Sequence, residues 1–204
     1  MRAVIACVNF DDYLAISLPA WKTVLGPHVE LRVVTAPHDL ATQNVAADNH
    51  VPAILTKAWY TGGPFNLAAG FTAGFAGVGI NEICLALDAD VVPSGWMPEQ
   101  WEIFPDIIYG AVRFNPDGAV APPANIPYIE ERGRGDSPEA CAGYFQLFRY
   151  SSERSFGSYP TAATYDYEFA FQFPHGETLT TMKVMHLGER HKNWEGRVSP
   201  RIDP

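Results

Sequence analysis

Short apolar runs alternate with segments of helical spacing through the first half of the chain. Ala3–Val8 and Ile83–Leu87 are uninterrupted apolar runs, and Val29–Thr35 is a third strand-like segment. Runs this short and this apolar are typical of strands buried on both faces. Between them, Tyr13–Leu25 and Phe65–Gly79 carry apolar or small residues at helical spacing. The order strand, helix, strand, helix, strand predicts a parallel sheet covered by helices.

The second half has a mixed pattern. A proline- and glycine-rich segment, 115–139, reads as loop. A short helix is expected over Tyr165–Phe173, and residues 40–52 read as a polar helix or loop. No segment resembles a linker, so the 204 residues predict one α/β domain with a mixed sheet flanked by helices. The strands expected in this half are Ile107–Phe114, Ala142–Tyr150 and Met182–Leu187.

Composition narrows the function classes. A formal net charge of -9 argues against broad, unspecific nucleic-acid binding. The last residues are locally basic, which suits either an anionic ligand or a solvated tail. Three cysteines, two of them inside apolar runs, suit a reducing compartment. Residues 58–81 lack charge but are interrupted by Gly62-Gly63-Pro64, so we do not expect them to span a membrane. We expect a cytoplasmic protein.

The triplet Asp88-Ala89-Asp90 directly follows the apolar run Ile83–Leu87. In extended chain, both carboxylates can point the same way. Open α/β sheets bind ligands at the carboxyl ends of their strands. Two carboxylates in a crevice repel each other and favour a hard divalent cation between them. The alternative is that strand ends simply favour Asp in turns and helix caps.

Five segments in order give the chain a resemblance. The triplet with its flanks looks like the DxD segment of GT-A fold glycosyltransferases, broadly of the family 2 type. Phe65–Gly70 is similar to the helix that precedes DxD in many of them, although Leu67 stands where they have Lys. The other three similar segments are Gly143–Phe148, Tyr165–Glu168 and the closing stretch His186–Arg197. The resemblance implies one GT-A (Rossmann-like) catalytic domain over 1–204, with a nucleotide-sugar-binding half (1–93) and an acceptor-binding half (94–204).

The resemblance also implies a metal and donor site. Asp88 and Asp90 would hold Mn²⁺ or Mg²⁺ on the diphosphate of a nucleotide sugar, a UDP-sugar being favoured. His186 would be a third ligand, or else a core histidine at a strand end. Imidazole suits Mn²⁺ better than Mg²⁺. The further donor-binding residues that it implies are Asn9, Asp11, Asp39, Lys57, Asn66, Arg190 and Lys192.

Asp166 is the candidate catalytic base, with Glu168 as the fallback. Positions 166 and 168 of a helix do not share a face, so only one can point into the site. The alternative for either acid is an interaction with the helix dipole. A true base at Asp166 implies single displacement with inversion. The loop Glu130–Pro138 reads as a lid or a plain surface loop, and Trp59, Trp96, Trp101 and Trp194 as sugar-stacking or core residues.

Two other functions compete. A haloacid-dehalogenase-like phosphatase also uses an aspartate pair after a strand, but on its first strand, and it needs a later acidic pair and a Lys. A catalytically inactive sugar-nucleotide-binding module is favoured by two departures from the pattern, Leu67 and Tyr165. For an active enzyme the acceptor stays open between a saccharide, a protein and a hydroxymethylated DNA base of the phage type.

Overall fold

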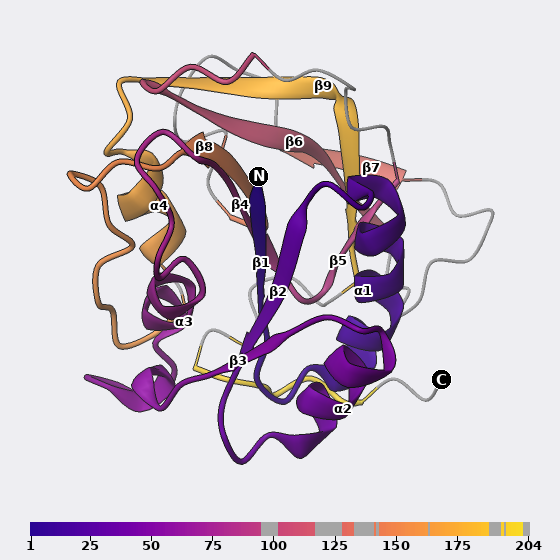
Figure 1. Ribbon diagram of the computed structural model, residues 1–204. Coiled ribbons are helices and arrows are strands. Elements are labelled where there is room, and N and C mark those ends of the chain that lie inside the picture. Colours follow the sequence, from indigo (N-terminus) through magenta and orange to yellow (C-terminus); the bar gives the residue numbers. More distant parts are fainter. Residues whose placement is uncertain are drawn as a thin grey trace.

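The computed structural model describes residues 1–94, 102–116, 128–132, 141, 143–162, 164–187, 193 and 195–201. These residues form a nine-stranded mixed sheet with helices on both faces (Figure 1). The α/β class and the mixed sheet expected from the sequence are therefore confirmed. Among the described residues, no helix is long and apolar enough to cross a bilayer.

The first half builds the parallel part of the sheet, in the order β3-β2-β1-β4. Its strands are β1 (Arg2–Ala6), β2 (Glu30–Thr35), β3 (Ala53–Leu55) and β4 (Ile83–Asp88). Its helices are α1 (Asp11–Leu25), α2 (Leu40–Asp48), the 3-10 helix η1 (Ala58–Tyr60) and α3 (Leu67–Gly74). Parallel strands end at the same edge, so the segments that follow β1, β2 and β4 meet there.

The second half extends the sheet beyond β4, in the order β8-β6-β9-β5, with β7 on β6. Its elements are β5 (Val91–Pro93), β6 (Ile107–Pro116), β7 (Tyr128–Arg132), β8 (Phe145–Arg149), α4 (Tyr165–Ala170) and β9 (His175–His186). β8 runs antiparallel to β4, whereas β6 and β9 run parallel to each other.

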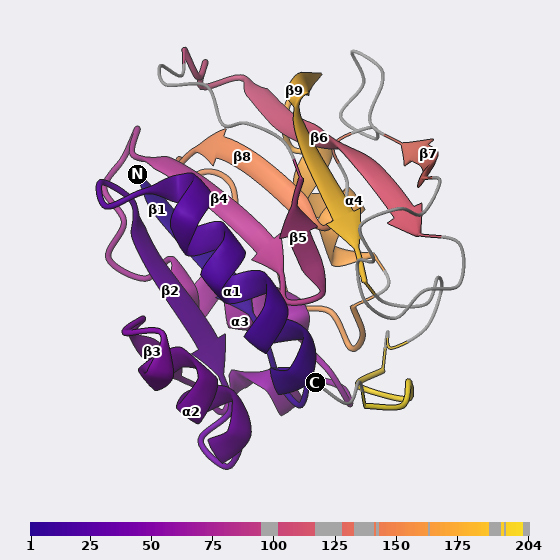
Figure 2. The same cartoon turned by 90° about the vertical axis from the view of Figure 1, so that its right-hand side faces the viewer.

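Two apolar layers hold the helices on the sheet. Alternate residues of β1 serve opposite faces: Ala3 and Ile5 pack with α1, and Val4 and Ala6 with α3. α1 and α2 cover one face, and α3 and α4 the other (Figure 1). In Figure 2, α1 lies across β1, β2 and β4. The fully buried side chain of Trp21 fills the space beneath it.

The second layer is aromatic. Phe156 stacks on Phe169 of α4 at 3.9 Å between ring centroids, and Phe71 of α3 stacks on Phe156 at 5.2 Å. Small residues let α3 approach closely: a Cβ on Gly74 would lie 2.5 Å from Val4 Cγ1. The small-residue face predicted for this helix is thus the face that meets the sheet.

Several boundaries differ from the expected ones. The helix predicted to run to Gly79 ends at Gly74, and Gly77 downstream has φ +78°. β7 lies inside the segment 115–139 that reads as loop. β9 begins at His175, seven residues before the predicted Met182, and its first part pairs with β6. The sequence prediction missed this part because it is polar and mostly exposed.

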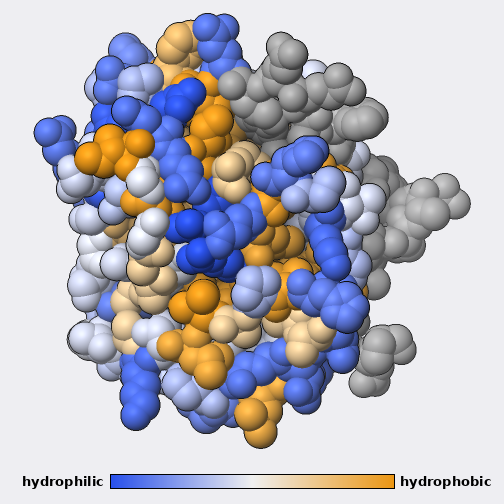
Figure 3. Space-filling view, in the orientation of Figure 1, coloured by the Kyte–Doolittle hydropathy of each residue, from blue (hydrophilic) through white to orange (hydrophobic). Residues whose placement is uncertain are grey.

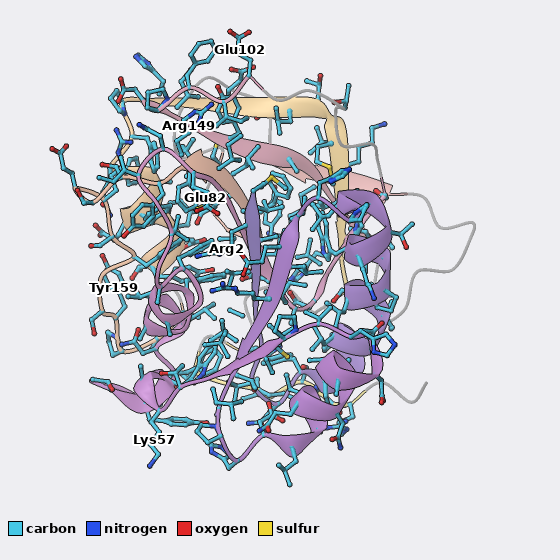
Figure 4. The ribbon with its side chains drawn as sticks, in the orientation of Figure 1. Arg2, Lys57, Glu82, Glu102, Arg149 and Tyr159 are labelled. Atoms are coloured by element: carbon cyan, nitrogen blue, oxygen red, sulfur yellow. The ribbon has the colours of Figure 1, made fainter. Side chains whose placement is uncertain are left out.

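Charged side chains cover the amino end of the parallel strands. The hydrophilic area at the centre of Figure 3 lies where Figure 4 labels Arg2 and Glu82. Arg2 is itself buried and pairs with Glu30 at 2.9 Å. This ionic cluster is at the opposite end of β1 from the segments discussed next.

Candidate active site

The candidate site lies at the carboxyl ends of β1, β2 and β4. Asp88 is the last residue of β4, Asn9 follows β1, and Asp39 follows β2. This is the edge at which open α/β sheets bind ligands. The fold therefore brings the donor-site aspartates of the sequence prediction to one edge.

Side chains of α1 fix the backbone of the aspartate triplet. The Ser17 hydroxyl donates to the Ala89 carbonyl at 2.6 Å, and the Trp21 indole donates to the Val91 carbonyl at 2.7 Å. Both Ser17 and Trp21 are fully buried. Buried hydrogen bonds of this kind are costly to break, so they hold the turn between Asp88 and Asp90 in one conformation.

Strand pairing brings His186 to Asp90. Val91 of β5 pairs with His186 of β9, and the Leu187 N–H donates to the Asp90 carbonyl at 2.7 Å. His186 Nε2 consequently lies 3.1 Å from Asp90 Oδ2. Burial alone would raise the pKa of Asp90, but the charge and hydrogen bond of His186, with the charge of Arg113, hold that pKa below its ordinary value.

Asp88 is in a different electrostatic situation. Burial, followed by repulsion from Asp90 and Asp166, raises the pKa of Asp88 to about 7. The Tyr165 hydroxyl donates to Asp88 Oδ1 at 3.2 Å. Burial and the nearby charges of Asp88 and Asp166 raise the pKa of Tyr165 well above its ordinary value, so it stays a hydrogen-bond donor.

Asp166 lies beside Asp88, on the first turn of α4. A Cβ on Gly143 would lie 3.3 Å from Asp166 Oδ2, so the carboxylate rests against the glycine. Gly143 has φ +94°, a conformation that favours glycine. Gln146 of β8 is buried and donates from its amide to the Asp166 carbonyl at 2.9 Å. Glu168 is exposed, so of the two candidate acids only Asp166 faces the aspartates.

The side chains at this edge are of the types that bind divalent cations, although the described ones are not arranged as a complete set of metal ligands. Within the described ranges, no three His, Cys, Asp or Glu side chains are grouped to hold a metal as they stand. Asp90 and His186 are in contact, however, and Asp88 repels Asp90 strongly enough to shift its own pKa. His186 Nδ1 is buried with no hydrogen-bond partner in the described part of the chain. Crowded carboxylates favour a hard divalent cation such as Mn²⁺ or Mg²⁺, and the neighbouring imidazole of His186 could be a further ligand.

Asp39 and Asn9 form the wall of the site on the β1 and β2 side. Asp39 Oδ2 accepts from the Asn9 N–H at 2.7 Å and from the Thr42 hydroxyl at 2.7 Å, and Oδ1 accepts from the Thr42 N–H at 3.1 Å. Asp39 therefore caps α2 and holds the Asn9 backbone, which has φ +63°. The Asn9 side chain is exposed.

The C-terminal segment crosses this edge and pairs with the start of α1 (Figures 1 and 2). Arg197 forms a bidentate ion pair with Asp12 and lies 5.2 Å from the Phe10 ring centroid. Arg201 pairs with both carboxylate oxygens of Asp11. These two arginines form ion pairs with acids of the same chain, so their positive charges are already compensated. Asp11 lies at the expected edge, but its carboxylate is already paired.

The two other described residues predicted to bind the donor, Asn66 and Lys57, differ in exposure. Asn66 is fully buried, and its amide oxygen accepts from the Ala69 N–H at 3.0 Å, capping α3. Its amide nitrogen donates to the Thr61 carbonyl and to Ser158 Oγ. These contacts give Asn66 a structural place rather than one open to a ligand. Lys57 is exposed and points away from the molecule in Figure 4.

Some predictions fall outside the described residues. Arg190 and Lys192, predicted to contact the diphosphate, are among them. So are Trp96, Trp101, Trp194 and most of the loop expected to form a lid. Trp59 is described and is a core residue, fully buried and stacked on Phe65 at 5.6 Å.

Sequence reasoning missed several residues that the fold places here. Tyr165 carried a signal, because it stands where the similar family has an acid. Arg113, Gln146, Ser17 and Trp21 gave none, because each reaches the site through strand or helix packing across long sequence separations.

No family model matches the chain, and the search of curated proteins found no match. Solved structures do. S. aureus TarS 1-349 in complex with UDP-GlcNAc has a TM-score of 0.57 at 14% identity, over 93% of this chain and 60% of that one. The mannosyltransferase PcManGT from Pyrobaculum calidifontis in complex with GDP-Man and Mn²⁺ has a TM-score of 0.58 at 12% identity, over 94% of this chain and 57% of that one. The chain thus spans 57–60% of the length of these two neighbours. At this level of identity the likeness concerns architecture, and the chain has a GT-A-like glycosyltransferase fold.

Proposed function

We propose that the protein is a metal-dependent glycosyltransferase that moves a sugar from a nucleotide-diphosphate sugar to an acceptor hydroxyl. The observation that carries the proposal is the convergence of Asp88, Asp90, His186 and Asp166 at the carboxyl edge of the sheet. Two neighbours of the same fold were solved with nucleotide sugars, one of them with Mn²⁺. A UDP-sugar donor and Mn²⁺ are favoured.

Asp90, His186 and Asp88 would hold the cation. When bound, Mn²⁺ or Mg²⁺ supplies Lewis-acid stabilisation to the leaving nucleoside diphosphate. Arg113 adds positive charge beside Asp90 and supports its ionised form. We place the nucleotide next to Asn9 and Asp39. Arg190 and Lys192 remain candidates for contact with the diphosphate.

Asp166 is the proposed general base. Its carboxylate takes the proton of the acceptor hydroxyl as that oxygen attacks the anomeric carbon and the bond to the diphosphate breaks. One displacement of this kind inverts the anomeric configuration. The exposed Glu168 is not placed to replace it.

The acceptor classes to test are a saccharide, a protein and a hydroxymethylated base of phage-type DNA. The net charge of -9 disfavours a DNA acceptor. The ion pairs of Arg197 and Arg201 with acids of α1 also remove two of the basic groups that would favour it. Saccharide and protein acceptors are therefore favoured over DNA.

The two competing functions fare differently. The aspartate triplet follows β4 and not the first strand, which disfavours the phosphatase. The inactive binding module needs a direct test, because Tyr165 replaces an acid. We expect the purified protein with Mn²⁺ to release nucleoside diphosphate from one or more nucleotide sugars, by transfer or slow hydrolysis. Asp90→Ala should lower that rate at least 100-fold, whereas Asp48→Ala, an exposed change on α2, should not.

Binding of a nucleotide sugar without turnover would instead identify the binding module. Consumption of no nucleotide sugar, together with Mg²⁺-dependent hydrolysis of a chromogenic phosphate ester that Asp88→Asn abolishes, would establish the phosphatase.

A further inference from the structure

Tyr165 connects the two halves of the proposed site. It precedes Asp166 in the chain, and its hydroxyl reaches across to β4 and donates to Asp88 Oδ1 at 3.2 Å. The residues are 77 positions apart in sequence.

The ring of Tyr165 is fixed as firmly as its hydroxyl. Tyr165 is 3% exposed and stacks on Phe71 of α3 at 5.7 Å, with 24° between the ring planes. A buried aromatic ring that stacks on another ring can adopt few other rotamers. The direction of the hydroxyl is therefore set by packing and not by the hydrogen bond alone.

α4 depends on such contacts for its position. It is six residues long, and its N-cap residue Thr164 makes no side-chain capping bond. Isolated helices of this length are unstable, so tertiary contacts place it. Phe169 packs against Phe156, Gln146 holds the Asp166 carbonyl, and Tyr165 supplies the link to Asp88.

We propose that Tyr165 is a positioning residue that orients the Asp88 carboxylate for the cation and fixes the distance between Asp88 and the base Asp166. The inference rests on the proposed function. A hydroxyl that occupies Oδ1 leaves Oδ2 of Asp88 for a cation, and it limits rotation of the carboxylate. Partners of this kind behind a metal ligand typically change metal affinity or activity 10–100-fold when removed. The tyrosine is then a replacement for the acid at this position and not a sign of lost activity.

The test compares Tyr165→Phe with Tyr167→Phe, which makes the same chemical change on the same helix at a half-buried site away from Asp88. Tyr165→Phe keeps the ring stacking, so it should fold with a thermal midpoint close to the wild type. Two readouts apply: Mn²⁺-dependent donor affinity by calorimetry, and kcat for turnover. We expect Tyr165→Phe to weaken the Mn²⁺-dependent affinity about 10-fold and lower kcat by a similar factor, with both near wild type in Tyr167→Phe.

A double-mutant cycle with Asp88→Ala separates positioning from general stability. If Tyr165 acts through Asp88, Tyr165→Phe has no further effect on affinity in the Asp88→Ala background. Equal losses in both backgrounds, or wild-type affinity and kcat in Tyr165→Phe, would overturn the inference and leave the proposed function standing. Failure of the wild type to bind any nucleotide would overturn the proposed function itself.

Discussion

Replacing Asp88 by Asn should stabilise the protein in the absence of metal. The side chain keeps its size, and the amide oxygen can still accept from the Tyr165 hydroxyl. What is lost is a half-buried negative charge that Asp90 and Asp166 repel. Raising the pKa of Asp88 from 3.8 to about 7 corresponds to a ceiling of about 4 kcal/mol in lost stability at alkaline pH.

The sign follows from proton linkage. The folded protein holds the Asp88 proton more tightly than the unfolded chain, so the metal-free wild type loses stability as pH rises from about 4 to about 7, and the loss is complete above that. Asp88→Asn lacks this loss. We expect it to gain at least about 1 kcal/mol at pH 8, a rise of about 3 °C in Tm, and a smaller gain at pH 5.

The assay is thermal unfolding in EDTA at both pH values, with Asp48→Asn as the control. Asp48 is exposed, so the same loss of one charge should change stability by no more than about 0.5 kcal/mol. A lower Tm for Asp88→Asn at pH 8, or an equal difference at the two pH values, would show that Asp88 is not held in a repulsive carboxylate cluster.

Four further results are expected. Gly143→Ala should lower turnover at least 10-fold, because it places a Cβ against Asp166 at a left-handed φ; wild-type kinetics would contradict the placement of the base. Arg197→Ala should lower the free energy of unfolding by about 3 kcal/mol, because it leaves the buried Asp12 carboxylate without its bidentate partner. Arg201→Ala removes an exposed arginine and should lower the free energy of unfolding by less than about 1 kcal/mol. A larger loss for Arg201→Ala than for Arg197→Ala would refute the argument from burial. The three buried cysteines, whose pKa values burial raises, should react with a thiol reagent only after denaturation, and fast native labelling would contradict their burial. EDTA should abolish turnover and Mn²⁺ restore it, and turnover that persists in EDTA would exclude a metal-dependent reaction.

The parts of the fold that were predictable from sequence are those with a dense apolar signal. The runs Ala3–Val8 and Ile83–Leu87 became β1 and β4, because both faces of a central parallel strand are buried. β3 and β5 have three residues each, too few for any periodicity to show. β7 was hidden because its sequence, Tyr-Ile-Glu-Glu-Arg, is charged and lies between prolines and glycines.

The site residues also differ in how far the sequence could predict them. Asp88 and Asp90 could be predicted because a strand end is a local feature. The Ser17 and Trp21 bonds that fix their backbone span 72 and 70 residues, and no local pattern marks them. Asp39 and Asn66 were predicted to bind the donor, and the structure shows that both also cap a helix, Asp39 that of α2 and Asn66 that of α3. The capping role depends on backbone N–H groups three residues further on, and the predicted donor role did not reveal it.

The central claim is that the carboxylate edge binds a nucleotide sugar through a divalent cation. The most direct measurement is the thermal midpoint with a panel of UDP-, GDP- and dTDP-sugars, each with and without Mn²⁺, for the wild type and Asp90→Ala. A ligand at 100 times its dissociation constant stabilises by about 2.7 kcal/mol, which corresponds to a rise of roughly 5–10 °C. We predict such a rise for at least one sugar nucleotide, a UDP-sugar first, only with Mn²⁺ and only in the wild type. No rise with any nucleotide, or an equal rise in Asp90→Ala, would contradict the claim.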